Sequence, residues 1–197
     1  MIISDSKKFA FIHVPKTGGS TISFVLNQYS KRIEIDESKH GWQIPLHTGP
    51  MHDKFVNARK HIPEDYYTFA FVRNPFEVLV SGFKRKKYPD FNNFIEMSLG
   101  ENSNYIFNRH TQYEYLSHDG TSNGKILLSH IGKYETFAED FDIIAQDIKI
   151  PERYKELPRK NASYKDEKSY REYYNEKTRN AVEKRYKKDL EYFGYEF

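Results

Sequence analysis

The chain has 197 residues, of which 38% are hydrophobic, 16% are aromatic and 30% are charged, proportions that suit one globular domain and argue against disorder. It contains no cysteine, which excludes disulfides, thiolate zinc sites and a cysteine nucleophile. Its formal net charge of +3 is too small to indicate a nucleic-acid partner.

No apolar stretch approaches the roughly 20 residues that a membrane-spanning helix needs. Lys7 and Lys8 lead into a strand-like run rather than into the cleavage region of a signal peptide. The chain shows neither an internal repeat nor a linker-like segment. The sequence therefore predicts a single domain over residues 1–197 in a soluble, cytoplasmic protein.

The first predicted unit is a strand, a loop and a helix. Residues 9–14 are a short apolar run rich in residues that favour strands, and residues 21–29 place apolar side chains at helical spacing. Between them lies "PKTGGST", residues 15–21, which combines a lysine with a pair of glycines.

The second unit repeats this order. The segment "YYTFAFVR", residues 66–73, has the pattern of a buried strand. Asn74 and Pro75 follow as the expected N-cap and first residue of a helix. Asp90 is then predicted to cap a further helix that ends near Gly100.

The last third of the chain supplies one more strand and two more helices. Residues 125–135 are predicted to form the strand and its exit, and Thr136 with Glu139 has the pattern of a capping box. The final helix is predicted over residues 176–193, before Gly194. Alternating strands and helices predict an α/β fold, with a central parallel sheet flanked by helices and ligands at the carboxyl ends of its strands.

The loop at residues 15–21 has the composition of a phosphate site. Gly18 and Gly19 allow the backbone to approach a ligand closely, and Lys16 adds a cation beside a helix start that favours negative charge. Hydroxyl groups that can donate to phosphate oxygens are present on Thr17, Ser20 and Thr21. The familiar motif GxxxxGK[ST] places its lysine after its glycines, whereas Lys16 precedes them, so the ordinary ATPase or GTPase loop is absent.

The second strand-to-helix turn offers another anion site. Arg73 is predicted at the end of its strand, and Ser81 follows eight positions later on the helix. The planar guanidinium of arginine matches a phosphate through two parallel hydrogen bonds. Two phosphate sites on adjacent strand ends suit a nucleotide that is phosphorylated at both ends of its ribose.

These two segments resemble sulfotransferases that use PAPS, 3′-phosphoadenosine 5′-phosphosulfate. "FIHVPKTGGSTI" is similar to the loop that binds the 5′-phosphosulfate, and "FAFVRNPFEVLVSGF" is similar to the segment that binds the 3′-phosphate. The nearest group is the carbohydrate sulfotransferases of the heparan 2-O and chondroitin type, with their small bacterial and viral relatives. "IGKYETFAEDF", "LPRKNAS" and "DLEYFGYEF" resemble later landmarks, so the likeness covers most of the chain.

The resemblance implies a P-loop-like fold and a role for each matching residue. Lys16 would lie beside the oxygen that bridges phosphate and sulfate, and Arg73 with Ser81 would bind the 3′-phosphate. The remaining residues of the first loop would hold the 5′-phosphate; they are Thr17, Gly18, Gly19, Ser20 and Thr21. The segment that opens at His52 resembles the one that begins with the catalytic base, and a neutral histidine near physiological pH suits that task.

Several alternatives stay open at this stage. His47 is the rival base or a substrate contact, and residues 157–166 are either a nucleotide contact or a solvated basic loop. The acceptor is expected to be a hydroxyl on a saccharide or glycan, and no metal is expected. The competing functions are a kinase-like phosphotransferase that requires magnesium and a non-catalytic binder of nucleotide or glycan.

Overall fold

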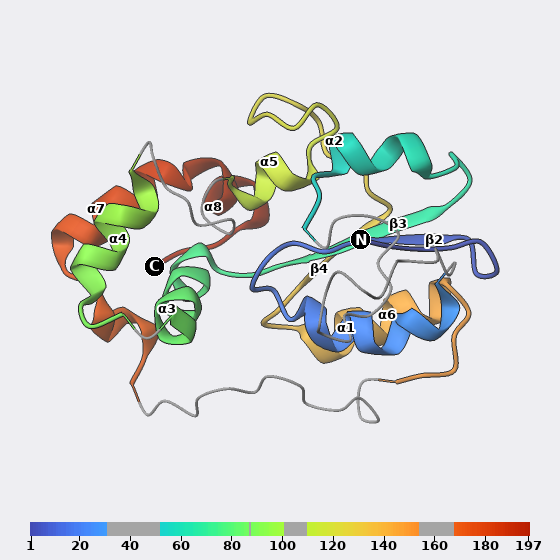
Figure 1. Ribbon diagram of the computed structural model, residues 1–197, viewed down its shortest axis with the longest axis horizontal. Helices are drawn as coiled ribbons and strands as arrows, with labels where there is room; N and C mark the ends of the chain where they lie inside the picture. The colour runs from blue at the N-terminus through green and yellow to red at the C-terminus, as the bar shows by residue number, and fades with distance from the viewer. Residues whose placement is uncertain (31–51, 87, 101–109, 154–167) are drawn as a thin grey trace, which may run out of the picture.

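The computed structural model describes residues 1–30, 52–86, 88–100, 110–153 and 168–197, and its centre is a four-stranded sheet (Figure 1). The strands lie in the order β1 (Ile2–Ser4), β2 (Phe9–Ile12), β3 (Tyr67–Val72) and β4 (His130–Lys133). β2, β3 and β4 are parallel, as predicted, whereas β1 pairs antiparallel with β2 and was not predicted. The α/β class and its largely parallel sheet are therefore confirmed.

The helices of the described segments connect and cover these strands. The α-helices are α1 (Gly19–Leu26), α2 (Phe55–Ala58), α3 (Pro75–Lys86), α4 (Phe91–Leu99), α5 (Gln112–Leu116), α6 (Phe137–Asp147), α7 (Glu176–Arg185) and α8 (Lys187–Phe193). Short 3₁₀ turns occur at η1 (Asn27–Tyr29), η3 (Arg59–His61) and η5 (Tyr170–Tyr173).

The two faces of the sheet carry side chains of different size, because successive residues of a strand point to opposite faces. The aromatic face packs against α1 and α6; its residues in β2 and β3 are Phe9, Phe11, Phe69 and Phe71. The other face packs against α2 and α5; its residues in the same strands are Ala10, Ile12, Ala70 and Val72. Figure 1 shows the two pairs of helices on opposite sides of the sheet.

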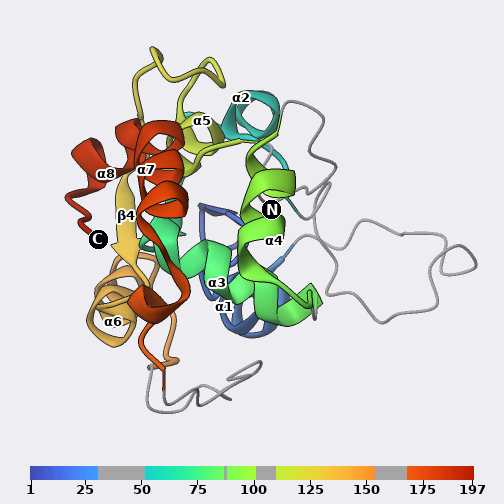
Figure 2. The same cartoon turned by 90° about the vertical axis from the view of Figure 1, so that its left-hand side faces the viewer.

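A third buried cluster lies beyond the sheet, where α3, α4 and α7 meet. Phe76 and Leu79 of α3 contact Phe94 of α4 and Val182 of α7 in this cluster. Figure 2 looks onto this end of the molecule and shows the three helices together. The cluster fixes α3, the helix that follows β3, against elements that are distant in sequence.

The helix predicted over residues 176–193 is interrupted at Tyr186. That residue has φ −103° and ψ 18°, so the chain bends there between α7 and α8. The bend lets each segment pack on a different neighbour, because α7 contacts α4 whereas α8 contacts α5. The prediction of one continuous helix was therefore wrong.

One prediction for the segment before α6 is confirmed and one needs correction. The strand predicted within residues 125–135 is β4, and directly before it the Ser129 hydroxyl accepts a hydrogen bond from the Thr68 amide. The expected capping box at Thr136 is absent, since the Thr136 hydroxyl donates to Asp140 instead.

Three other predicted helix ends are confirmed, whereas the first helix, predicted over residues 21–29, is α1 (Gly19–Leu26) followed by the 3₁₀ turn η1. The Asn74 side chain accepts from the Phe76 amide at the start of α3, and Asp90 accepts from the Asn93 amide at the start of α4. Gly194 ends α8 in the left-handed conformation. None of the helices in the described part of the chain combines the length and apolarity that crossing a bilayer requires.

Candidate functional site

The candidate site lies where the three parallel strands end. The chain leaves β2 into the loop before α1, leaves β3 into α3, and leaves β4 towards α6. Parallel strands place these three exits on one edge of the sheet, where ligands of open α/β sheets bind. Lys16, Arg73 and Tyr134 follow the three strands in turn.

The loop between β2 and α1 turns through two left-handed residues. Lys16 has φ 67° and Gly18 has φ 82°, a region that is easily reached by glycine but strained for other residues. The buried Thr17 hydroxyl donates to the Val14 carbonyl at 3.0 Å and so fixes the loop from within. Gly18 is the N-cap residue and has no side chain that could cap α1, so the amide end of this helix favours an anion, although the Thr21 amide already donates to the Gly18 carbonyl at 3.1 Å.

Gly19 is required by close packing. A Cβ atom at this position would overlap the ring of His13, which is buried and stacks on Phe11 at the end of β2. His13 also lies 3.5 Å from the hydroxyl of Ser23, measured at Nδ1. The second glycine of the loop therefore allows α1 to begin directly above the His13 ring.

His52 packs against the same histidine. The two rings meet edge to face with centroids 4.6 Å apart, and Nδ1 of His52 lies 3.1 Å from the His13 carbonyl oxygen. A carbonyl only accepts hydrogen bonds, so Nδ1 carries the hydrogen and Nε2 of the neutral ring carries the lone pair. His52 is thereby held in the tautomer that takes up a proton at Nε2.

The surroundings of His52 favour this neutral form. Burial lowers the pKa of its imidazole, and the positive charges of the Met1 amino group, Arg85 and Lys16 lower it further. The hydrogen bond to His13 acts in the opposite direction but is outweighed. His52 is therefore uncharged at neutral pH, as a proton acceptor must be.

Lys16 experiences a strongly positive environment. Its half-buried side chain has a pKa lowered to about 8, first by burial and then by the charges of Arg85 and Arg73. A lysine that is destabilised in its charged form by neighbouring cations gains most when a negative ligand arrives. The electrostatics of this loop fit an anion.

Arg73 is oriented by two contacts at the end of β3. Its Nε and one terminal nitrogen donate to Glu77 at 3.0 and 2.8 Å, and its guanidinium lies 4.1 Å from the centroid of the Tyr134 ring. The side chain is only 18% exposed. The other terminal nitrogen of Arg73 has no part in the Glu77 contact.

Tyr134 connects the two turns and was not identified from the sequence. Its ring stacks under Arg73, and a Cβ atom placed on Gly18 would lie 3.2 Å from it. Its amide donates to the Val72 carbonyl, which fixes it to the end of β3. Its position directly after a predicted parallel strand was the available signal.

Arg85 stood out in the sequence only as part of the basic cluster at residues 84–87, which could attract an anionic partner. It is exposed on α3, and its charge acts on both Lys16 and His52. Glu77, Ser81 and Arg85 are spaced four residues apart, so they share one face of the helix. The available signal was this spacing within a run of basic residues.

The remaining predicted residues divide into those that the structure describes and those that it does not. Ser20 is exposed and Thr21 half-buried in the first turn of α1, and Ser81 is half-buried on α3. His47 and residues 157–166 lie outside the described residues. Within the described ranges, no cluster of histidine, aspartate or glutamate side chains has the arrangement of a metal site.

Comparison with known proteins gives the family. A family model described as "Sulfotransferase family" matches residues 1–196. A protein of Archaeoglobus fulgidus described as uncharacterized is 30% identical over 93 residues, which are 47% of this chain and 76% of the relative. No solved structure matches the chain. Because the family model spans nearly every residue, the chain belongs to the sulfotransferase family.

Proposed function

We propose that the protein transfers a sulfuryl group from PAPS to an acceptor hydroxyl, within a P-loop-like sulfotransferase fold. The observation that carries this proposal is the convergence of Arg73 and Arg85 on Lys16 at the carboxyl edge of the sheet, where both arginine charges act on the lysine. Glu77 pairs with Arg73, so the group retains excess positive charge. A donor with a phosphosulfate at one end and a phosphate at the other suits that charge.

Each end of the donor would use one of the two turns. The amides that open α1, together with Lys16 and the hydroxyls of Ser20 and Thr21, would hold the 5′-phosphosulfate. Arg73 and Ser81 would hold the 3′-phosphate. The Thr17 hydroxyl already donates to Val14, so Thr17 would contribute through its backbone and through the shape of the loop.

Sulfuryl transfer resembles phosphoryl transfer, in which positioning and charge stabilisation supply most of the catalysis. Nε2 of His52 would accept the proton of the acceptor hydroxyl while the oxygen of that hydroxyl forms a bond to sulfur. The bond from sulfur to the bridging oxygen breaks, and Lys16 would stabilise the charge that develops on the leaving phosphate. The products are a sulfate ester, 3′-phosphoadenosine 5′-phosphate and a proton on His52.

His47 remains the second candidate for the base, although it lies outside the described residues. The tautomer that the His13 carbonyl imposes on His52 supports His52. The acceptor that we propose is a saccharide hydroxyl. Basic residues at the end of α3 suit a sugar chain that carries acidic groups.

The test is calorimetric titration with 3′-phosphoadenosine 5′-phosphate, AMP and ATP, without added metal. We expect clear preference for the 3′-phosphorylated nucleotide, followed by formation of a sulfate ester when PAPS and acceptor saccharides are supplied. Tighter binding of ATP, strengthened by magnesium, would instead indicate a phosphotransferase. Preference for the 3′-phosphorylated nucleotide without turnover on any hydroxyl acceptor would indicate a binding protein.

A further inference from the structure

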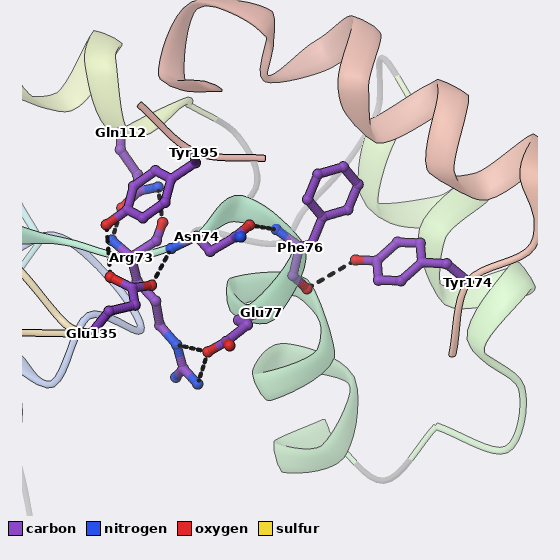
Figure 3. Close-up of polar contacts among 8 residues, drawn as sticks. All are labelled: Arg73, Asn74, Phe76, Glu77, Gln112, Glu135, Tyr174 and Tyr195. Carbon is purple, nitrogen blue, oxygen red and sulfur yellow. Dashed lines mark hydrogen bonds and ion pairs between the residues drawn. The ribbon is translucent and has the colours of Figure 1, made fainter. Parts of the chain in front are cut away.

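The Arg73–Asn74 turn is held by hydrogen bonds from distant parts of the chain. Its contacts come from α5, from the segment after β4 and from the segment after α8. Figure 3 shows these side chains gathered around the turn, with the Arg73 guanidinium pointing away from them towards Glu77. The backbone of the turn and the side chain of Arg73 thus have separate sets of partners.

Gln112 holds the backbone of Arg73 on both sides. Its side-chain oxygen accepts from the Arg73 amide at 2.9 Å, and its side-chain nitrogen donates to the Arg73 carbonyl at 2.7 Å (Figure 3). Gln112 is 5% exposed, so these hydrogen bonds are shielded from water. A buried amide with both ends engaged in this way fixes the backbone direction at Arg73.

Gln112 is fixed in turn by Asp189 of α8. The two carboxylate oxygens of Asp189 accept from the amides of Gln112 and Tyr113 at 2.9 and 2.8 Å, and the carboxylate is completely buried. These amides open α5, where helical hydrogen bonds leave donors unsatisfied. Asp189 thereby connects the C-terminal helix to the turn that carries Arg73.

Glu135 and the segment after α8 hold the other half of the turn. Glu135 accepts from the Asn74 amide and from the Tyr195 hydroxyl, each at 2.8 Å. The Asn74 side chain donates to the Glu196 carbonyl, also at 2.8 Å. The amides of Arg73 and Asn74 are therefore both engaged within the protein, whereas the Arg73 guanidinium contacts Glu77 and the Tyr134 ring at the edge of the sheet.

We propose that Gln112 and Glu135 are positioning residues that aim Arg73 at the 3′-phosphate of the donor. This inference rests on the proposed function. Among the described residues, the side-chain hydrogen bonds of Gln112 and Glu135 go to the Arg73–Asn74 turn and to Tyr195, and none goes to the loop between β2 and α1, so we expect the clamp to act mainly on the 3′ end of the nucleotide. The arrangement predicts that loss of the clamp weakens the binding of nucleotides that carry a 3′-phosphate and leaves the binding of other nucleotides unchanged.

The test compares Gln112→Met with Tyr113→Phe. Gln112→Met keeps the size of the side chain but removes both hydrogen bonds to Arg73. Tyr113→Phe changes the next residue of the same helix and removes its hydrogen bond to the Gly124 carbonyl. Calorimetry with 3′-phosphoadenosine 5′-phosphate should show about tenfold weaker binding for Gln112→Met and unchanged binding for Tyr113→Phe. Binding of AMP, which lacks the 3′-phosphate, should be unchanged in both variants.

The outcomes separate the inference from the proposed function. Wild-type protein that does not prefer the 3′-phosphorylated nucleotide over AMP would overturn the proposed function, and the inference with it. Wild-type preference that survives in Gln112→Met, or equal loss for both nucleotides, would overturn the inference alone. If Gln112→Met fails to fold, Tyr195→Phe removes only the hydroxyl that holds Glu135. We expect it to weaken binding of the 3′-phosphorylated nucleotide a few-fold, and an unchanged affinity would contradict the clamp.

Discussion

The two strand-to-helix turns of the site are built in different ways. The loop after β2 is shaped by its own residues, through left-handed backbone at Lys16 and Gly18 and the hydroxyl of Thr17. The turn after β3 is held by residues that lie 39, 61 and 122 positions from their partners. A site can therefore combine a locally encoded anion loop with an arginine whose direction depends on the whole fold.

The comparison also assigns different tasks to the two turns. The first loop carries Lys16, and the His13 carbonyl before it holds His52. We therefore expect this loop to control the chemical step. The second turn carries Arg73 and should control the affinity for the nucleotide. Changes in the first turn are therefore expected to reduce kcat, and changes in the second to raise the donor Kd.

The largest effect is expected from His52→Ala. Removal of the proton acceptor should lower kcat by about 10²- to 10⁴-fold while the Kd of the donor stays unchanged. His61→Ala is the matched control, because His61 is an exposed histidine of the same segment. Steady-state kinetics with PAPS and a saccharide acceptor measure the effect, and wild-type kcat in His52→Ala would assign the base to another residue such as His47.

Lys16→Ala should lower kcat by about 10²- to 10³-fold, with a smaller rise in donor Kd, because its charge acts mainly on the leaving phosphate. Lys8→Ala is a close control, since Lys8 also has a left-handed backbone, with φ 51°, but lies at the opposite end of β2. Single-turnover rates and calorimetry separate the two quantities. A change confined to Kd would show that Lys16 only anchors the donor.

Arg73→Ala should raise the Kd of 3′-phosphoadenosine 5′-phosphate by about 10- to 100-fold, because charge-assisted hydrogen bonds to the 3′-phosphate are lost. The affinity for AMP should not change. Arg179→Ala is the control, since Arg179 makes the same kind of ion pair with a glutamate four residues later. If kcat at saturating donor falls more than affinity does, the division of tasks between the two turns is wrong.

The smallest effect concerns pH. The pKa of Lys16 is lowered to about 8, so donor affinity should be constant below pH 8 and should fall above it by no more than the rise in Kd expected for Lys16→Ala. Lys16→Arg should remove this dependence, because arginine stays charged. Calorimetry between pH 7 and about pH 9.5 tests this, and a flat wild-type profile would contradict the lowered pKa.

The same lowered pKa changes stability with the opposite sign. The folded protein binds fewer protons at Lys16 than the unfolded chain between pH 8 and the ordinary lysine value of 10.5. The free energy of unfolding without ligand should therefore rise with pH in that window, while donor binding weakens. Thermal unfolding of the free protein over the same pH range distinguishes the two effects.

The sequence predicts those features of the fold that depend on residues close together in the chain. The parallel strands, the cap at Asn74 and the turn at Gly18 follow from local pattern and backbone preference, and the structure has all three. The three-residue strand β1 is too short to show a pattern. The bend at Tyr186 depends on which helices α7 and α8 contact, which no local pattern contains.

The candidate site shows the same division. The sequence identifies Lys16 and Arg73 because each follows a recognisable strand. Gln112 belongs to a five-residue helix, and its partner Asp189 is 77 positions away, so neither has a local signal. Packing across the fold decides their roles, and such packing cannot be inferred from spacing alone.

The position of Glu196 in the chain has a consequence for biosynthesis. Proteins are made from the N-terminal end, and the loop after β2 has all of its own residues once α1 has been synthesised. The Arg73–Asn74 turn, by contrast, gains its last two partners only when the ribosome has added Tyr195 and Glu196. The hydrogen bonds that fix the Arg73–Asn74 turn can therefore be completed only after the residues of the loop after β2 have long been synthesised.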